Sequence, residues 1–238
     1  MTRWHRRARP LLGTLVEIGA DDAGATDAGF AAIEAVQAAL SRFDPNSDVA
    51  RFNALAGGGS IGIGAHTARV LRLAQRLHAA SDGLFDVTLG SAPRGWRCFD
   101  GRLHRLDPAA HIDLGGIGKG YAVDRAIDAL RAHGCRAGWV NAGGDLRVFG
   151  DVALPLALRD EVRGGARPFG TLTDGAFATS YYAVDSRSQA SGARPVRAHV
   201  SVAAPLALWA DALAKVVALS GDDRHPLLAR HSARAWLH

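Results

Sequence analysis

The loop Asp113-Leu114-Gly115-Gly116-Ile117-Gly118-Lys119-Gly120 has the residue types of an anion-binding segment. Glycines let backbone N–H groups approach an oxyanion, and a helix that follows presents its positive end to the same anion. The loop is not a Walker phosphate loop, because Gly120 rather than Ser or Thr follows Lys119. It is not a dinucleotide fingerprint either, because Tyr121 stands at the third glycine position. A phosphate site and a tightly packed start of a helix both remain open.

Four aspartates lie beside small residues, which suits hydrogen bonding or the binding of a hard cation. They are Asp86, Asp113, Asp145 and Asp211. Each one alone is more typical of a turn or a helix cap. The sequence has no HExxH or CxxC pattern, so the common zinc sites are not indicated.

Two further patterns point to no chemistry. Residues 58–62 match the nucleophile-elbow pattern G-x-S-x-G in letters, but the residues before Ser60 are loop-like, and a catalytic serine is not favoured. Cys98 and Cys135 are too few for a disulfide framework and are expected to be free thiols.

Composition excludes several classes of protein. The chain has 238 residues, of which 48% are hydrophobic, and it carries 28 Lys+Arg against 23 Asp+Glu. It is long enough to bury a sizeable core, which excludes disordered and fibrous proteins. The basic residues are scattered among acids, so no nucleic-acid partner is expected. No apolar run approaches the ~18 residues of a membrane span. Only Lys119 and Lys215 are lysines.

The first residues are rich in arginine, and residues 1–10 are expected to be a flexible basic N-terminus before one domain over residues 11–238. Arg6-Arg7 followed by Leu11-Leu12 resembles the start of an export signal, but no small-residue cleavage site or lipid-acceptor cysteine follows. The sequence as it stands is expected to be cytoplasmic, or periplasmic if a leader is missing.

Apolar periodicity predicts helices and strands in mixed order. Helices are predicted over residues 28–40 with a cap at Thr26 or Asp27, over residues 66–80, after the glycine loop to about residue 130, and over residues 207–219 with an end at Gly221. Strands are predicted over residues 11–18, 138–142, 146–149, 154–158, 175–179 and 199–203. This order favours an α+β fold of mixed, mostly antiparallel sheets and packed helices in a single compact unit.

In order and spacing, a series of segments through nearly the whole chain resembles the ApbE family of FAD:protein FMN transferases. The segments are Leu12-Gly13-Thr14, residues 41–47 with Arg51-Phe52-Asn53, residues 83–90, residues 112–124, residues 141–145, Ala178-Thr179-Ser180, Ser201-Val202-Ala203 and residues 210–213. The resemblance implies an enzyme with the ApbE-like fold. Such an enzyme binds FAD with a divalent cation, usually Mg²⁺, transfers FMN to a Ser or Thr of a target flavoprotein, and releases AMP.

The resemblance also implies roles for particular residues. Leu12 would line the flavin site, Phe43 would stack on a ring, Leu84, Phe85 and Asp86 would form a wall, and Asp113 and Lys119 would hold FAD. Gly116, through its carbonyl, and Asp211, through its carboxylate, would bind the metal.

One departure from the family concerns a segment that in family members usually resembles His-Ile-Ile-Asp-Pro-x-Thr-Gly. The His and Asp of that segment lie beside the reacting phosphate. Here residues 181–192 replace it and contain no histidine. Val184-Asp185 and Ser191-Gly192 are its closest remnants, so Asp185 is the candidate catalytic residue. His199 is a weaker substitute.

The other departure is Lys215, which stands where the family usually has a metal-binding Thr. An ammonium has no lone pair for Mg²⁺. Four residues after Asp211 on a helix, Lys215 would share a face with it. We favour a Lys215–Asp211 pair that weakens or replaces the metal site over a lysine that points to solvent.

Three functions follow from these observations. The first is FMN transfer from FAD. The second is FAD binding without catalysis, which the missing histidine favours. The third is an FAD pyrophosphatase that releases FMN and AMP.

Overall fold

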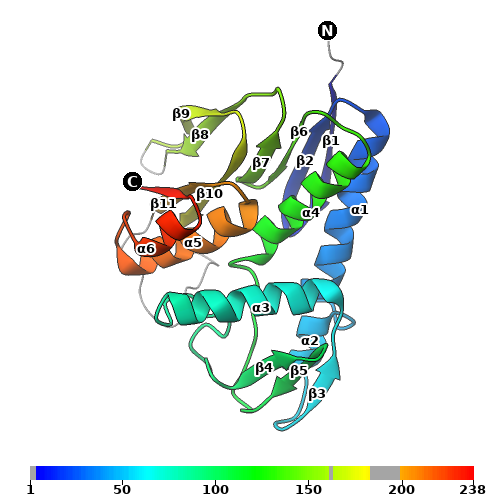
Figure 1. Cartoon of the computed structure of the whole chain (residues 1–238), viewed down its shortest axis with the longest axis vertical. Helices are drawn as coiled ribbons and strands as arrows, with labels where there is room; N and C mark the ends of the chain where they lie inside the picture. Colours follow the sequence, from blue (N-terminus) through cyan, green and yellow to red (C-terminus); the bar gives the residue numbers. More distant parts are fainter. Residues whose placement is uncertain (1–3, 161–162, 183–198) are drawn as a thin grey trace.

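The computed structural model describes residues 4–160, 163–182 and 199–238. Its centre is a seven-stranded sheet in the order β1-β2-β6-β7-β10-β11-β12, and every neighbouring pair of strands is antiparallel (Figure 1). The strands are β1 (His5–Leu11), β2 (Thr14–Ala20), β6 (Gly138–Ala142), β7 (Asp145–Phe149), β10 (Gly175–Tyr181), β11 (His199–Ala204) and β12 (Arg234–Leu237). The predicted α+β class with mostly antiparallel sheets is confirmed.

Three helices cover one face of this sheet and form the main core with it. They are α1 (Ala23–Leu40), α4 (Gly118–Ala132) and α5 (Ala207–Ser220). Helix α5 is buried on nearly all sides, because apolar residues occupy most of its circumference and it packs on α4, β10 and β11. The short helix α6 (Pro226–Arg230) leads into β12.

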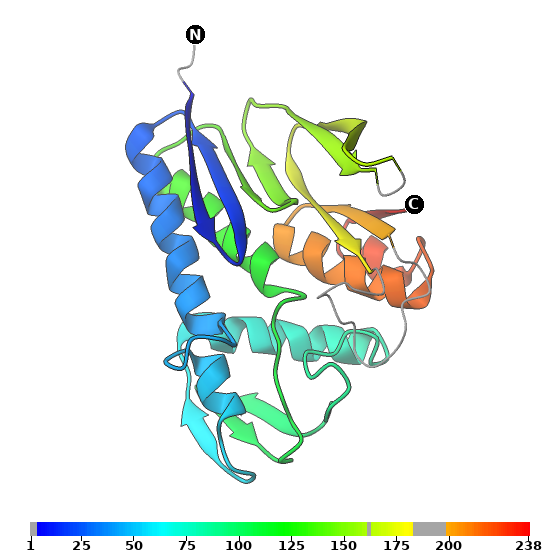
Figure 2. The same cartoon turned by 180° about the vertical axis from the view of Figure 1, so that it is seen from behind.

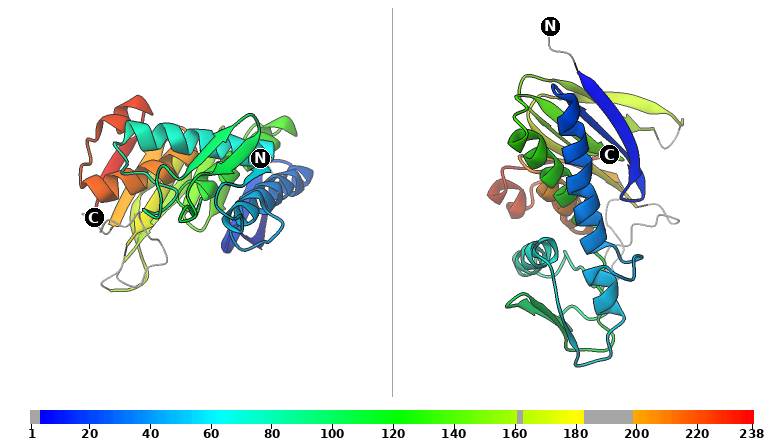
Figure 3. Two further views of the ribbon diagram at one scale, coloured as in Figure 1. Left: turned by 90° about the horizontal axis from the view of Figure 1, so that it is seen from below. Right: turned by 90° about the vertical axis from the view of Figure 1, so that its right-hand side faces the viewer.

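The opposite face of the sheet carries a smaller core. Strands β8 (Leu154–Arg159) and β9 (Ala166–Leu172) form a hairpin on the side away from the helices (Figure 3). Leu156 and Leu158 of this hairpin pack on Val148 and Phe177 of the sheet. The sheet therefore has a hydrophobic layer on both faces.

Helix α1 runs into the lower part of the molecule, where the remaining elements lie (Figure 2). These are α2 (Asp48–Asn53), β3 (Ser60–Gly62), α3 (Ala65–Ala80), β4 (Trp96–Phe99) and β5 (Arg102–Arg105), with the three strands in the order β3-β5-β4. Ser60 opens a strand, and its hydroxyl accepts a hydrogen bond from Arg102 Nη2 at 2.9 Å. The absence of a nucleophile elbow at Ser60, as the sequence indicated, is confirmed.

Several predicted elements are found within one or two residues, including α3, β6, β7, β8 and β11. Helix α5 ends at Gly221 in the left-handed conformation, with φ 69°, so the predicted glycine cap is confirmed. The predicted start of the first helix is wrong. Helix α1 begins at Ala23, because the Asp22 carboxylate accepts the Ala25 N–H at 3.0 Å and so provides the cap.

The prediction of a flexible N-terminus is wrong for residues 5–10. His5–Leu11 form the edge strand β1, which pairs along its whole length with β2, and the predicted strand over residues 11–18 is divided by the turn at Leu12 and Gly13. Both turn residues have positive φ, 56° and 72°, as a tight hairpin with two central residues requires.

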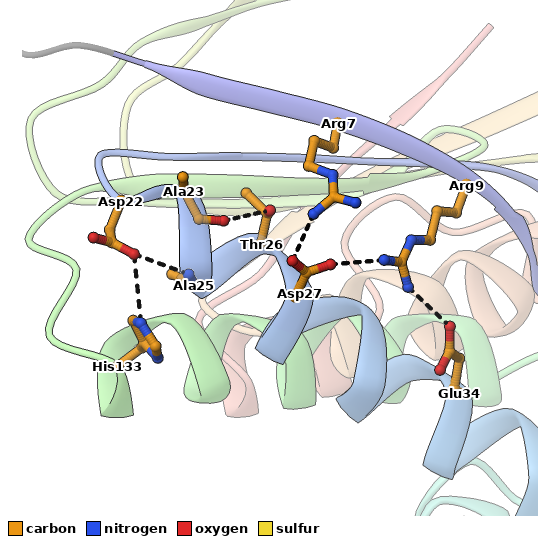
Figure 4. Close-up of polar contacts among 9 residues, drawn as sticks. All are labelled: Arg7, Arg9, Asp22, Ala23, Ala25, Thr26, Asp27, Glu34 and His133. Atoms are coloured by element: carbon orange, nitrogen blue, oxygen red, sulfur yellow. Dashed lines mark hydrogen bonds and ion pairs between the residues drawn. The ribbon is translucent and has the colours of Figure 1, made fainter.

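Arginines of β1 connect the hairpin to α1 (Figure 4). Asp27 accepts Arg7 at 2.6 Å and Arg9 at 2.7 Å, and Arg9 also reaches Glu34 at 3.2 Å. These partners lie 18 to 25 residues away from Arg9 in the sequence. Arg7 and Arg9 therefore have no acidic partner nearby in the sequence, but in the fold they form ion pairs with acids of α1.

Asp27→Ala is expected to lower the free energy of unfolding by less than about 1 kcal/mol, because its side chain is 56% exposed and water screens its ion pairs. Urea denaturation at low salt and at high salt measures the change, which should shrink at high salt. A loss of more than about 2 kcal/mol that does not depend on salt would show that this contact stabilises the hairpin far more than an exposed pair does.

Within the described ranges, no helix is both long enough and apolar enough to cross a membrane.

Candidate functional site

A cavity of about 580 Å³ lies where the end of α1, the first turns of α4 and the body of α5 meet, and its size suits a small-molecule ligand. Segments far apart in the sequence line it. They are the turn at Leu12 and Gly13, residues from Val36 to Phe43, residues from Leu84 to Leu89, residues from Asp113 to Lys119, residues 179–182, and Lys215 with Leu219.

The structure brings the predicted site residues together around this cavity. Those on its wall are Leu12, Phe43, Leu84, Phe85, Asp86, Asp113, Gly116 and Lys119. Asp211 lies behind the wall and is fully buried. Asp185, the predicted catalytic residue, lies outside the described residues.

Leu12 reaches the cavity because the β1–β2 hairpin turns over α1. Its N–H donates a hydrogen bond of 2.5 Å to the Gln37 side chain of α1. This bond fixes the tip of the hairpin to the helix that forms the neighbouring wall.

Phe43 and Arg42 stand at one side of the cavity. The Phe43 side chain is 81% exposed, and the Arg42 guanidinium carbon lies 4.6 Å from the centre of its ring. Arg42 Nη1 also lies 3.3 Å from Asp113 Oδ2, while Asp113 Oδ1 accepts the Gly115 N–H at 2.7 Å. An exposed ring of this kind offers a face to a planar ligand, and Arg42 adds a positive charge beside it.

Asp86 lies on the wall, but its carboxylate is engaged by its own loop. Oδ1 accepts the Thr88 N–H at 2.9 Å, and Oδ2 accepts the Thr88 hydroxyl at 2.8 Å and the Gly90 N–H at 2.9 Å. These bonds hold the loop that carries Leu84 and Phe85, so Asp86 shapes the wall through the backbone around it.

The starts of α4 and α5 lie against each other, and each helix supplies an acceptor to the other. The Gly120 N–H in the first turn of α4 donates to Asp211 Oδ2 at 3.0 Å. In return, Asp124 of α4 accepts the N–H groups of Ala207 and Leu208, both at 3.0 Å. First-turn N–H groups lack partners within their own helix, so these aspartates act as caps across the helix interface. The reciprocal caps fix Lys119 relative to Asp211.

The floor of the cavity consists of two ion pairs. Lys119 pairs with Asp145, and Lys215 pairs with Asp211. The Lys119 and Lys215 side chains are 35% and 17% exposed, against 3% for Asp145 and 0% for Asp211. The ammonium groups thus face the cavity and the carboxylates lie behind them. The predicted Lys215–Asp211 pair is confirmed.

Neighbouring charges decide the ionisation of these groups. Burial raises the pKa of Asp145, and the nearby Asp211 carboxylate raises it further. Burial also acts to raise the pKa of Asp211, but Lys215 and Lys119 outweigh it, so that pKa lies below its usual value. Burial acts to lower the pKa of Lys215 and of Lys119, and the carboxylates outweigh it in both, so both amines stay charged.

The predicted metal ligands do not suit a divalent cation in this arrangement. Asp211 Oδ1 accepts Lys215 and its Oδ2 accepts the Gly120 N–H, so both oxygens are engaged. A Cβ atom on Gly116 would lie 3.6 Å from Lys215 Cε, which means that the lysine stem passes beside this residue as well. In the described part of the chain no group of three or more His, Cys, Asp or Glu side chains could hold a metal.

Three residues of this site have a role that the sequence does not specify. Asp145 is one of the four aspartates suited to hydrogen bonding or cation binding, but its pairing with Lys119 depends on a contact 26 residues away. Arg42 precedes the aromatic residue that was singled out. Tyr182 lies in the segment that departs from the family, and its side chain lines the cavity. Only the fold reveals that Arg42 and Tyr182 line one cavity and that Asp145 lies behind Lys119.

Comparisons with known proteins identify the family of the chain. The model of the ApbE family matches residues 12–105 and 95–237. A curated FAD:protein FMN transferase of Rhodobacter capsulatus is 27% identical in an alignment that covers 74% of this chain and 42% of that protein. The chain therefore spans less than half of that relative.

Solved structures share the fold. The flavin transferase ApbE from Vibrio cholerae superposes with a TM-score of 0.84 at 19% identity, over 99% of this chain and 93% of that one. The ApbE protein from Thermotoga maritima gives a TM-score of 0.83 at 22% identity, over 99% and 94%.

Proposed function

Because the chain belongs to the ApbE family, we propose that it is an FAD:protein FMN transferase. It moves FMN from FAD to a Ser or Thr of a target flavoprotein and releases AMP. FAD is therefore its substrate, and the flavoprotein is its partner.

One cavity combines an apolar wall, an exposed aromatic ring and two ammonium groups, and this combination carries the proposal. Leu12, Leu84 and Phe85 offer apolar surface for a flavin ring, and Phe43 offers a face for stacking. Lys119 and Lys215 present positive charge at the floor, which suits a pyrophosphate. A dinucleotide with a flat ring system and a doubly charged linker matches both features.

In the transfer, the hydroxyl oxygen of the acceptor attacks the phosphorus of the FMN half. A new P–O bond forms, the bond from that phosphorus to the bridging oxygen breaks, and AMP leaves with the bridging oxygen. The ammonium groups at the floor stabilise the negative charge that develops on the phosphate oxygens. The hydroxyl proton passes to a base, for which Asp185 stays the prediction.

One observation favours a second function. Residues 181–192 contain no histidine, so the chain lacks the acid–base residue that its family resemblance implies for this segment. A protein that binds FAD without transferring FMN would retain the cavity and need no base.

Incubation with FAD separates these functions. The purified protein is mixed with FAD, with and without Mg²⁺, and with a domain that carries a candidate acceptor Thr or the same domain with Val at that position. AMP and covalent flavin that appear only with the Thr domain support transfer. AMP and free FMN without an acceptor indicate a pyrophosphatase, and bound, intact FAD indicates a binding protein. Failure to bind FAD contradicts the proposal.

Phe43→Ala is expected to weaken FAD binding about five- to tenfold, because the stacking face is lost. The melting temperature should change little, since the Phe43 ring is exposed and contributes little to the core. Flavin fluorescence titration measures the affinity, and Phe43→Tyr, which keeps the ring, serves as the control. Unchanged affinity in Phe43→Ala would show that this ring does not contact the flavin or the adenine.

A further inference from the structure

Lys215 occupies the region between the two residues predicted to bind a metal. Its ammonium pairs with Asp211 on the same helix, and its stem passes beside Gly116 of the loop before α4. A positive charge is therefore already built into the place where the family resemblance implies a cation.

The floor presents this charge toward the ligand. The two carboxylates are buried behind their lysines, which are the more exposed partners in both pairs. The four charges sum to zero, yet their layering places the positive ends toward the cavity. An anionic phosphate above this layer is nearer to the ammonium groups than to the carboxylates.

Tyr182 adds a buried hydrogen-bond donor. It directly follows β10, is 8% exposed, and is among the residues that line the cavity. Its Oη lies near Ser180, but among the residues that the structure describes it has no hydrogen-bond partner of acceptable geometry. Burial raises the pKa of this phenol, so the hydroxyl keeps its proton. A buried hydroxyl without a partner is costly, which indicates that a ligand supplies the acceptor.

We propose that Lys215 takes the place of the divalent cation and that Tyr182 Oη donates to the same phosphate, so that the chain binds the pyrophosphate of a dinucleotide without a metal ion. This inference rests on the proposed function, since the dinucleotide is FAD. It goes beyond that function because it assigns the phosphate subsite and removes the requirement for Mg²⁺ in binding.

Titration of the wild-type protein with FAD, in EDTA and in Mg²⁺, tests the inference. The dissociation constant is expected to agree within about twofold between the two conditions. FAD binding that appears only with Mg²⁺ overturns the inference and leaves the proposed transferase intact. No FAD binding in either condition overturns both.

Lys215→Thr is expected to weaken FAD binding in EDTA about 30-fold or more, because a buried charged contact is lost. Mg²⁺ should restore the affinity, since Asp211 Oδ1 is then free for a cation. Without FAD, Mg²⁺ should raise the melting temperature of this variant by about 5 °C and leave the wild type unchanged. A variant that shows neither response to Mg²⁺ contradicts the placement of Lys215 at the cation site.

If Lys215→Thr does not fold, Asp211→Asn with Lys215→Met removes both charges and avoids an unpaired buried carboxylate. This double variant should bind FAD about tenfold or more weakly, with no recovery in Mg²⁺. Wild-type affinity in the double variant overturns the inference.

Tyr182→Phe is expected to weaken FAD binding about five- to tenfold in both EDTA and Mg²⁺, because only the hydroxyl is removed. Tyr121→Phe is the control, since Tyr121 is not among the residues that line the cavity and its hydroxyl pairs with His66 Nδ1 at 2.9 Å. Equal affinities of the two variants would show that Tyr182 Oη does not contact the phosphate.

Discussion

Asp124→Ala is expected to lower the free energy of unfolding by about 3–5 kcal/mol, the range for removal of one partner from a buried ion pair. Asp124 is 2% exposed and accepts Arg147 Nη1 at 2.8 Å in addition to the first two N–H groups of α5. Its loss leaves the charged Arg147, a residue that is 7% exposed, and two backbone donors without this acceptor.

The size of this effect comes from the groups left behind. Burial raises the pKa of Asp124, while the Leu208 N–H and the Arg147 guanidinium act in the opposite direction. The charged carboxylate is thus costly to bury, and the pair itself contributes little net stability. Asp124→Asn together with Arg147→Met should therefore recover part of the loss, because no charge stays unpaired.

Thermal and urea unfolding measure the change, and the melting temperature should fall on the order of 10 °C. Asp128→Ala is the matched control on the same helix, since its side chain is 46% exposed and pairs with Arg125 on the surface of that helix. The control should differ from wild type by about 0.5 kcal/mol or less. Similar losses in Asp124→Ala and Asp128→Ala would refute the cap that α4 supplies to α5.

Gly120→Ala is expected to lower the free energy of unfolding by about 3 kcal/mol, at the upper end of the usual cost of overpacking. A Cβ atom at this position would lie 2.3 Å from the Ala207 carbonyl oxygen and 2.8 Å from Leu208 Cα. These are backbone atoms that cannot rotate away, so the starts of α4 and α5 must separate. Separation of the two helices also lengthens the hydrogen bond from the Gly120 N–H to Asp211, and it displaces Lys119 from the floor of the cavity.

Unfolding experiments and FAD titration test this prediction together. Gly118→Ala is the matched control, because its Cβ atom would meet only side-chain atoms of Leu40 and Leu114 at 3.7 Å and 3.8 Å. The control is expected to stay within about 1 kcal/mol of wild type. Gly120→Ala with wild-type stability and wild-type FAD affinity would refute the close approach of the two helices.

Local patterns predicted the long elements well, because each of them carries its own periodicity. Helix α3 buries one face, and strand β6 buries every second residue. The spacing of their apolar residues therefore predicts both elements directly. Strand β1 gave no such signal, since its arginines find their acids on α1 and β2. The strands of the lower part, with three or four residues each, are too short for a pattern to distinguish.

The residues of the site also divide into those that the sequence predicts and those that it does not. The glycine loop could be singled out from its own residue types, and the role of Asp211 because a series of spaced segments resembles a family. The roles of Arg42, Asp145 and Tyr182 could not be predicted, since each acquires its role from a neighbour far away in the sequence or from a lining position in the fold. The i,i+4 spacing of Asp211 and Lys215 is the exception, because a helix alone brings those side chains together.

The sequence by itself determined the α+β class, the family, the helical pairing of Lys215 with Asp211, and the loop that begins α4. The tertiary structure decided which charge faces the ligand and which is buried behind it. It placed Lys119 on Asp145, let α4 and α5 cap each other, and left the Tyr182 hydroxyl buried without a hydrogen-bond partner among the described residues. The physical reason is that periodicity encodes contacts within one element, whereas desolvation and the choice of ion-pair partner depend on elements that meet only when the chain folds.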